Sequence, residues 1–413
     1  MRESPTNPSA SPAPVTRAFR ALPPGIWALG FVSMFMDTSS ELMHSLLPIF
    51  MSSVLGASML TIGMIEGIAE ATAAVTKMFS GTISDYLGKR KALVLLGYAL
   101  SAITKPVFPL ASDIGWVFAA RFVDRIGKGI RGAPRDALIA DLVPPPQRGT
   151  AYGLRQALDS VGAFIGPLLA VVFMLWLADN LREVLWVAVV PAFLAVLVLV
   201  VAVREPSRRS ARQPNRVTFA GMKRLSPHYW WTVALGAVFT LARFSEAFLI
   251  LRARDVGLAI DYAPLIMVVM NVVYAICAYP AGVAADRLSA RTLLLLGLAV
   301  LVLADTTLAL SASPAPAFVG AALWGLHMSL TQGLLSKLVA DTAPGRLRGT
   351  AFGIFNLISG VSLLLASVVA GALWEAFGAA TTFVAGAAFA ALAIVGLALY
   401  RPGNRPAAGS TRG

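Results

Sequence analysis

Long apolar stretches constrain this chain more than any other feature. Twelve of them reach about 20 residues, the length that an α-helix needs to cross the hydrocarbon core of a bilayer. Hydrophobic residues make up 57% of the 413 residues and charged residues only 13%, so a soluble enzyme, a disordered scaffold and a fibrous protein are poor fits. The predicted membrane-spanning helices are 26–52, 58–83, 92–111, 115–138, 150–178, 183–203, 229–251, 263–285, 292–311, 316–340, 350–374 and 379–400.

The chain is also a doubled unit. The segment LIADLVPPPQRGTAYG at 138–153 matches LVADTAPGRLRGTAFG at 338–353 at nine of sixteen positions. A second pair of segments, beginning at Gly81 and Gly282, shares a glycine, an aspartate and an arginine. Both copies should face the same side of the membrane, so each copy holds an even number of spans. We therefore expect an all-α integral membrane protein built as two six-helix bundles in a parallel repeat.

Basic residues predict the orientation. If both termini are cytoplasmic, loops and tails on that side hold 21 of the 34 Lys and Arg residues, against three in the opposite loops. Such a bias predicts a multi-pass protein of the inner (cytoplasmic) membrane with both termini inside. The net charge of +13 then belongs to loops at an anionic membrane surface rather than to a nucleic-acid site. The expected organisation is a disordered tail at 1–24, a bundle at 25–203, a linker at 204–228, a bundle at 229–400 and a tail at 401–413.

Other chemistry receives little support from the sequence. One cysteine, Cys277, excludes a disulfide framework within the chain and a cysteine metal cluster. The chain has no GxxxxGK[ST] phosphate loop, which argues against an ATP-driven pump. We expect no enzyme activity, no cofactor and no bound metal. The expected partners are a small-molecule substrate, protons and membrane lipid, without nucleic acid, and the expected functional unit is a monomer.

Charged residues recur inside the predicted spans. A charge at the bilayer centre costs roughly 2.5–3.5 kcal/mol on insertion scales, so the helices that carry them should face the bundle interior or a wet cavity. Internal ion pairs that lock helices together are the alternative interpretation. The candidate proton carriers are Glu41, Glu66, Glu70 and Asp124. The candidate substrate contacts are Asp37, His44, Arg121, Arg125, Arg243, Glu246 and Gln332.

Several motifs resemble those of one transporter family. The segment GTISDYLGKRK from Gly81 resembles motif A of the major facilitator superfamily, and the segment from Gly282 resembles its degenerate second copy. RFVDRIGKG from Arg121 is similar to the fourth-helix arginine motif, except that Asp124 and Arg125 replace uncharged or small residues. The motif A residues of interest are Gly81, Asp85, Gly88, Arg90, Asp286 and Arg291.

A further segment resembles motif C, the fifth-helix signature of proton-coupled exporters. Its residues are Gly162, Gly166 and Pro167, and the motif is incomplete because Ala170 stands where glycine is usual. The family resemblance implies two bundles that alternate access to a central site, with motif A as a conformational latch on the cytoplasmic side. It favours a secondary transporter that exports a small molecule by proton antiport. A proton-coupled or facilitative importer of a nutrient or metal, a lipid flippase, and a non-transporting receptor on the same scaffold are the alternatives.

Overall fold

The computed structural model describes residues 22–87, 89–205, 225–331, 333–343 and 347–399, and all of their regular structure is helical. The helices of the first half are α2 (Pro24–Ile49), η1 (Phe50–Val54), α3 (Met59–Leu87), α4 (Arg90–Thr104), α5 (Val107–Leu110), α6 (Ile114–Leu142), η2 (Pro145–Gln147), α7 (Arg148–Trp176), α8 (Leu181–Val187) and α9 (Val189–Ala202). Those of the second half are α10 (Pro227–Leu241), α11 (Ala247–Asp255), η4 (Ile260–Tyr262), α12 (Leu265–Arg287), α13 (Ala290–Leu310), α14 (Pro314–Thr331), α15 (Leu334–Thr342), α16 (Arg348–Phe377) and α17 (Ala379–Leu399).

Each predicted span lies on one helix or on two consecutive helices. Among the described residues, eight segments are long and apolar enough to cross a membrane by length and composition. The other four predicted spans lie on α2, α6, α10–α11 and α14–α15, which hold several polar side chains or are interrupted. The predicted tails and most of the predicted linker lie outside the described residues, so those boundaries stay predictions.

Local sequence explains three of the interruptions. Pro106 separates α4 from α5, and Pro191 follows the break between α8 and α9, because proline has no N–H to donate to the carbonyl four residues earlier. Gly333, the residue before α15, has a φ of 78°, a left-handed conformation that glycine adopts without strain.

The break between α10 and α11 has another cause, since it contains neither proline nor glycine. Residues 242–246 leave the helix in the middle of the seventh predicted span. The Ser245 N–H donates instead to Ser367 Oγ on α16, at 3.2 Å. Non-helical backbone at membrane depth is tolerated where it lies in protein or lines a cavity, and Ser245 does line a cavity.

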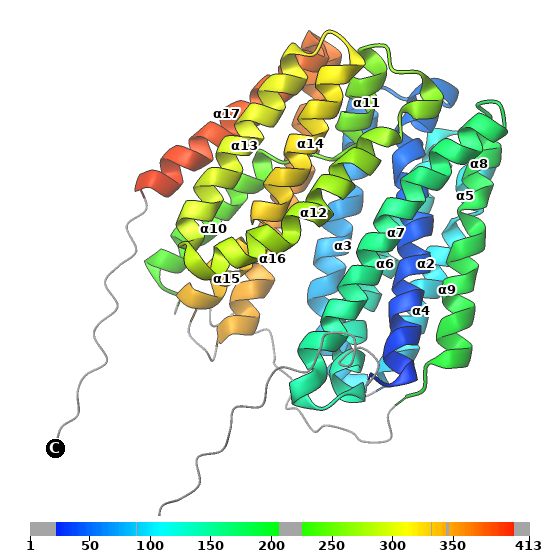
Figure 1. The fold of residues 1–413 in the computed structure, drawn as a ribbon, viewed down its shortest axis with the longest axis vertical. Helices are drawn as coiled ribbons and strands as arrows, with labels where there is room; N and C mark the ends of the chain where they lie inside the picture. The colour runs from blue at the N-terminus through cyan, green and yellow to red at the C-terminus, as the bar shows by residue number, and fades with distance from the viewer. Residues whose placement is uncertain (1–21, 88, 206–224, 332, 344–346, 400–413) are drawn as a thin grey trace, which may run out of the picture.

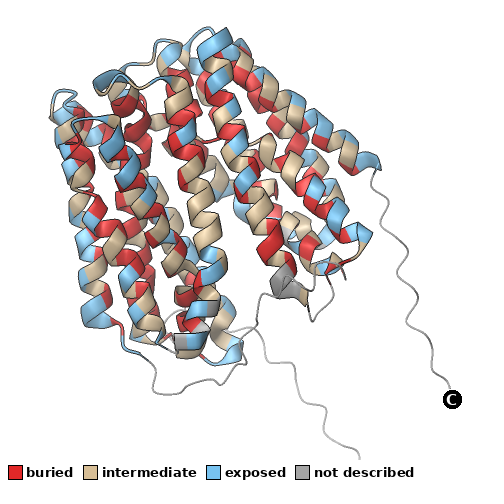
Figure 2. Ribbon diagram, turned by 180° about the vertical axis from the view of Figure 1, so that it is seen from behind, coloured by how far each residue is buried: buried red, intermediate tan, exposed pale blue. Residues whose placement is uncertain are grey.

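The two halves form two bundles that lie side by side (Figure 1). Buried residues face neighbouring helices, whereas the outer helix faces are exposed (Figure 2). Many of these exposed side chains are large and apolar, such as Trp176 at 76% and Leu310 at 79% exposure. An apolar outer surface of this kind suits lipid and would be costly in water.

The bundles meet closely at one end, which we call the closed end. A Cβ added at Gly63 of α3 would lie 2.2 Å from the Ser367 carbonyl oxygen, and one added at Gly371 of α16 would lie 2.4 Å from that of Met59. Glycine therefore allows α3 and α16 to approach across the two halves. At the opposite end, which we call the linker end, α2 begins, α9 ends and α10 begins, and the two bundles diverge (Figure 1).

Candidate functional site

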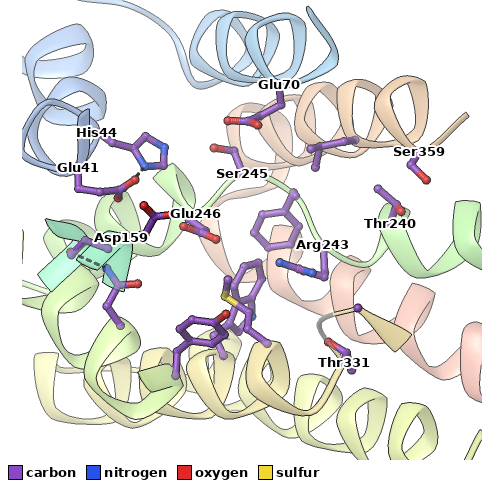
Figure 3. Close-up of a pocket in the computed structure, with 18 of the residues that line it drawn as sticks. Glu41, His44, Glu70, Asp159, Thr240, Arg243, Ser245, Glu246, Thr331 and Ser359 are labelled. Atoms are coloured by element: carbon purple, nitrogen blue, oxygen red, sulfur yellow. Dashed lines mark hydrogen bonds and ion pairs between the residues drawn. The ribbon is translucent and has the colours of Figure 1, made fainter. Parts of the chain in front are cut away.

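A cavity of about 660 Å³ lies between the two bundles, a volume that suits a small organic molecule. On α3 and α16 its lining residues, among them Glu70 and Ser359, lie on the linker-end side of the glycine contacts. Side chains from both halves project into it (Figure 3). Its lining residues with a carboxylate, imidazole, ammonium or guanidinium group are Asp37, Glu41, His44, Glu70, Arg125, Lys128, Asp159, Arg243 and Glu246.

His44 links two carboxylates in the wall of the first half. Its Nδ1 lies 3.8 Å from Glu41 Oε2, one turn earlier on α2, and its Nε2 lies 3.5 Å from Glu66 Oε2 on α3. Glu66 is fully buried and lies 2.8 Å from Arg121 Nη2 on α6. The same carboxylate accepts a hydrogen bond of 3.4 Å from Ser245 Oγ in the second half. We call Glu41, His44, Glu66 and Arg121 the His44 cluster.

A second ion pair follows one helical turn along the same two helices. Arg125 Nη2 lies 2.8 Å from Glu70 Oε1, and the Glu70 side chain is 29% exposed to the cavity. Glu66 and Glu70 are spaced i and i+4 on α3, as are Arg121 and Arg125 on α6. The helical repeat therefore stacks two acid–base pairs between these helices, one buried and one at the cavity.

Asp124 points away from the cavity. Its Oδ1 lies 3.2 Å from Lys105 Nζ at the end of α4, and both residues are buried. The same ammonium group donates to Ser40 Oγ at 3.3 Å. Asp124 is thus one partner of an internal ion pair that joins α6 to α4, and it is not among the residues that line the cavity.

The wall of the second half combines two charges with aromatic rings. Arg243 and Glu246 lie in the α10–α11 break and line the cavity, and neither makes an ion pair within 4 Å among the described residues. Phe244 packs on Trp324 with ring centroids 5.7 Å apart. A guanidinium and a carboxylate beside aromatic faces can hold an organic solute that carries a polar group.

The predicted site residues thus divide into three groups. Seven of them line the cavity: Asp37, Glu41, His44, Glu70, Arg125, Arg243 and Glu246. Glu66 and Arg121 are buried one layer behind that wall, and Asp124 lies on its far side. Gln332 lies outside the described residues. The charges on α2, α3, α6 and the α10–α11 break meet around the cavity, and α7, α12, α14, α15 and α16 complete its wall.

Comparison with known proteins identifies the family. The family model of the Major Facilitator Superfamily matches residues 27–253 and 235–413. An uncharacterised MFS-type transporter of Methanocaldococcus jannaschii is 32% identical over 365 residues, which cover 86% of this chain and 90% of that one. The chain belongs to the major facilitator superfamily. It is a multi-pass secondary transporter of small molecules and not an enzyme.

Two further similarities are more distant. Multidrug resistance protein MdtH of an Enterobacter species is 30% identical over 115 residues, which cover 28% of each chain. The crystal structure of the nucleoside transporter NupG superposes with a TM-score of 0.78 at 13% identity, covering 90% of this chain and 98% of that one. At this identity the likeness to NupG concerns the fold alone.

Several cavity residues of this transporter were not singled out from the sequence. Gln156 and Asp159 on α7 and Asn271 and Tyr274 on α12 line the cavity. Each pair is spaced i and i+3, so its members share one helix face. The signal that could have found them is a pair of polar residues at helical spacing within an otherwise apolar span.

The residues that resemble motif C bring α7 against α2. A Cβ added at Gly162 would lie 2.5 Å from the Met34 carbonyl oxygen, and one at Gly166 would lie 2.6 Å from that of Thr38. Pro167 cannot donate to the Ala163 carbonyl, four residues earlier. That carbonyl instead accepts a hydrogen bond of 3.1 Å from Asn271 Nδ2 on α12. The proline therefore leaves the Ala163 carbonyl free to accept a hydrogen bond from the second half.

The described motif A residues make contacts within their own halves. Arg90 forms an ion pair with Asp141 on α6 and donates to the Ala137 carbonyl at 2.9 Å. Arg291 donates to the Ala398 carbonyl on α17 at 2.6 Å. A Cβ added at Gly81 would lie 3.4 Å from the Ala133 side chain. Gly88 and the side chains of Asp85 and Asp286 lie outside what the structure describes.

Proposed function

We propose that this transporter exports a small organic molecule in exchange for protons by alternating access. Proton coupling is supported above all by the His44 cluster, because Glu66 is bonded both to Arg121 in its own half and to Ser245 in the other. Glu41, His44 and Glu66 can each bind a proton, and Glu41 lines the cavity. A proton arriving from the cavity would therefore change the charge at a contact between the halves.

Protonation would act on this contact through charge. Arg121 cannot lose its own proton, so it holds Glu66 as long as that carboxylate is ionised. A proton on Glu66 would weaken both the ion pair and the bond that Glu66 accepts from Ser245. A proton on His44 would attract both carboxylates to the imidazole. The cluster can therefore pass between arrangements that bind the second half differently.

The proposed orientation places the linker end in the cytoplasm. The linker from Arg204 to Arg224 holds seven basic residues, and such segments stay at the anionic inner leaflet. With this orientation the described conformation faces inward, because the glycine contacts of α3 and α16 close the opposite end. The proposed location is the cytoplasmic membrane, with both termini in the cytoplasm.

The direction of transport is supported by two observations. Gly162, Gly166 and Pro167 resemble the exporter signature, and they pack α7 against α2 beside the cavity. The relative MdtH is named as a multidrug resistance protein, a name that fits export. Import of a nutrient by the same coupling is the competing function, and the direction of proton flow separates the two.

Proton flux in everted membrane vesicles tests the proposal. Vesicles that contain the overproduced chain would be acidified by respiration and followed with a ΔpH-sensitive dye. A panel of drugs, metals, organic acids and sugars would then be added one at a time. We expect at least one organic compound to dequench the dye only in vesicles that contain the chain. Absence of any response, together with proton-driven uptake in intact cells, would replace export by import.

Matched variants test the role of the cluster and its neighbours. Glu41→Gln, Glu66→Gln and Glu70→Gln each remove one titratable group in or near the cavity, and we expect each to reduce or uncouple proton exchange. Glu183→Gln is the control, since Glu183 is exposed in the first turn of α8 and does not line the cavity. If all three variants keep the wild-type pH dependence, the protons bind elsewhere. If the cellular phenotype that depends on this chain persists when both Asp85 and Glu70 are neutralised, the chain is a receptor rather than a transporter.

A further inference from the structure

Asp305 on α13 is a fully buried carboxylate with a single hydrogen-bond partner. Its Oδ1 accepts a bond of 3.0 Å from Trp324 Nε1 on α14. Its Oδ2 has no hydrogen-bond partner in the described part of the chain. No ion pair within 4 Å joins Asp305 to a described lysine, arginine or histidine, in contrast to Glu66 with Arg121 and to the other buried acid of the spans, Asp124, with its lysine.

The described residues around Asp305 supply no ion-pair partner within 4 Å. Helix α17, which packs on α13, contains no charged residue. His327 on α14 contacts another part of α13. Its Nδ1 is bonded at 2.7 Å to the carbonyl of Gly297, which lies two turns from Asp305 towards the linker end. Arg252 of α11 donates to the Leu308 and Ala309 carbonyls at the closed end of α13, and its ion pair is with Asp255 rather than with Asp305. The remaining charged residues of α13 and of the elements near it are Arg243 and Glu246 in the α10–α11 break, Asp286 and Arg287 at the linker end of α12, Arg291 at the start of α13, and Lys337 and Asp341 on α15.

An isolated ionised carboxylate is far more costly to bury than a neutral one, and in practice such a group takes up a proton. The free Oδ2 offers the place for it. A Cβ added at Gly386 of α17 would lie only 2.5 Å from this oxygen. Glycine at this position thus leaves room for the carboxyl group in a well-packed interior.

Two aromatic side chains of the cavity wall lie close to Asp305. Trp324 donates its N–H to Asp305 and also lines the cavity. Phe244 packs on Trp324, lines the cavity, and comes from the non-helical α10–α11 break. A movement of the break or of the indole ring would therefore give water in the cavity access to the carboxyl group.

We propose that Asp305 is a proton-binding site of the second half, separate from the His44 cluster. It holds a proton on Oδ2 in this conformation and gives it to water in the cavity when Trp324 and Phe244 move during transport. The bond from the indole N–H to Oδ1 then stabilises the carboxylate that is left. The role in transport rests on the proposed proton coupling, and it gives each half of the transporter its own proton site.

Infrared spectroscopy of the purified full-length chain in lipid tests the bound proton without a substrate. A protonated carboxylic acid has a carbonyl stretch that an ionised carboxylate lacks. The wild-type spectrum minus that of Asp305→Asn should contain one such band. Trp324→Phe keeps an aromatic ring but removes the indole N–H donor, so it should shift the same band. This second variant also assigns the band if Asp305→Asn fails to fold. Wild-type spectra without a band that depends on either residue would overturn the proposal.

Vesicle measurements test the role of the proton in transport. The probes are the compounds that dequench the ΔpH dye with the wild-type chain. Asp305→Asn should lose this dequenching but keep exchange of the same labelled compound across the membrane, because exchange needs no net proton movement. Unchanged dequenching would overturn the role in coupling while leaving proton-driven export in place. If no compound dequenches the dye with the wild type and intact cells show proton-driven uptake, the export proposal fails, and the infrared measurement alone decides whether Asp305 holds a proton.

Discussion

Ser245 donates a hydrogen bond of 3.4 Å to Glu66, and this bond crosses between the two halves of the transporter. The same Glu66 oxygen lies 2.8 Å from Arg121 Nη2 and 3.5 Å from His44 Nε2. One buried carboxylate oxygen is therefore shared by an ion pair, an imidazole contact and an interdomain bond. The charge of Glu66 therefore stabilises both the first bundle, through Arg121, and the contact between the bundles, through Ser245.

The first prediction concerns the stability of this cluster. Arg121→Gln would leave Glu66 buried beside His44 without its fixed cation. Removing one partner of a buried ion pair typically costs about 3–5 kcal/mol, so we expect a clearly lower thermal unfolding temperature in detergent. Adding Glu66→Gln to that variant should recover part of the loss. Equal stability of all three proteins would show that the pair contributes nothing to folding.

Part of the site could be predicted from the sequence because helical spacing places charges on one face. Glu66 and Glu70, and likewise Arg121 and Arg125, are one turn apart, so each pair shares a helix face. The cost of a charge in lipid predicts that these charges point to the interior. Their partners depend on how helices are rotated against each other, which spacing does not encode. The same holds for the internal pair of Asp124, because spacing does not show that Lys105, at the end of α4, points inward to this carboxylate.

The fold was predictable for a related reason. Spans as long as α7 and α17 must cross a bilayer, and the repeat fixes two bundles. The α10–α11 break was not predictable, because no proline or glycine marks it and its backbone is satisfied by Ser367 on a distant helix. Tertiary contacts decided the local structure there.

The second prediction concerns the bond between Asn271 and the Ala163 carbonyl. Asn271→Ala would leave that carbonyl without a donor, because Pro167 cannot supply one. Asn271 and Ala163 both line the cavity, and the bond is part-buried. Its loss should therefore cost the net contribution of a typical hydrogen bond, about 0.5–1.5 kcal/mol, which corresponds to a change of roughly 2–13-fold in a conformational equilibrium. We expect the described conformation to lose population by that factor. Spin labels on α7 and α12 would measure it through their distance distribution.

A double variant is the control for this bond. Pro167→Ala restores an N–H that can donate to the Ala163 carbonyl within α7. Asn271→Ala should therefore have a much smaller effect in that background. Identical effects in both backgrounds would contradict the assigned role of the proline.

The third prediction concerns the glycine contact at the closed end. Gly63→Ala would place a Cβ 2.2 Å from the backbone oxygen of Ser367, so α3 and α16 must separate. We expect faster labelling, from the closed-end side, of a cysteine introduced at Thr240 in a Cys277→Ser background. Gly153→Ala is the matched control, since a Cβ there meets nothing within 4 Å. Equal labelling rates for both variants would mean that this contact does not close the cavity.

The fourth prediction concerns the motif A latch. Asp85→Asn removes the carboxylate that the family resemblance places at the cytoplasmic contact between halves. We expect this variant to be made and inserted normally but to transport slowly, because the outward-facing state would lose a stabilising contact. Protein level in the membrane and initial transport rate measure the two effects separately. Transport at the wild-type rate would remove the latch from the mechanism.

The last prediction concerns pH at the closed end, where Asp179 follows α7 and Asp261 lies in η4. A hydrogen bond shared with the Asp261 carboxyl raises the pKa of Asp179 above its ordinary value. The shared bond needs one proton, so the contact is fully present below the ordinary pKa of an aspartate. As the pH rises through the raised pKa of Asp179, its carboxyl group loses the shared proton, and the two carboxylates then repel each other. Higher pH should therefore loosen this contact between α7 and η4.

Distances between spin labels at Leu175 and Tyr262, both exposed, would follow this contact over a pH series. We expect the distance to increase as the pH rises through the raised pKa of Asp179. Asp261→Asn keeps a hydrogen-bonding partner for Asp179 that does not ionise, so it should flatten the pH dependence without opening the contact at low pH. Because both residues lie outside the membrane, this response should also weaken in high salt. A distance that stays constant over the series would show that this carboxyl pair does not contribute to closure.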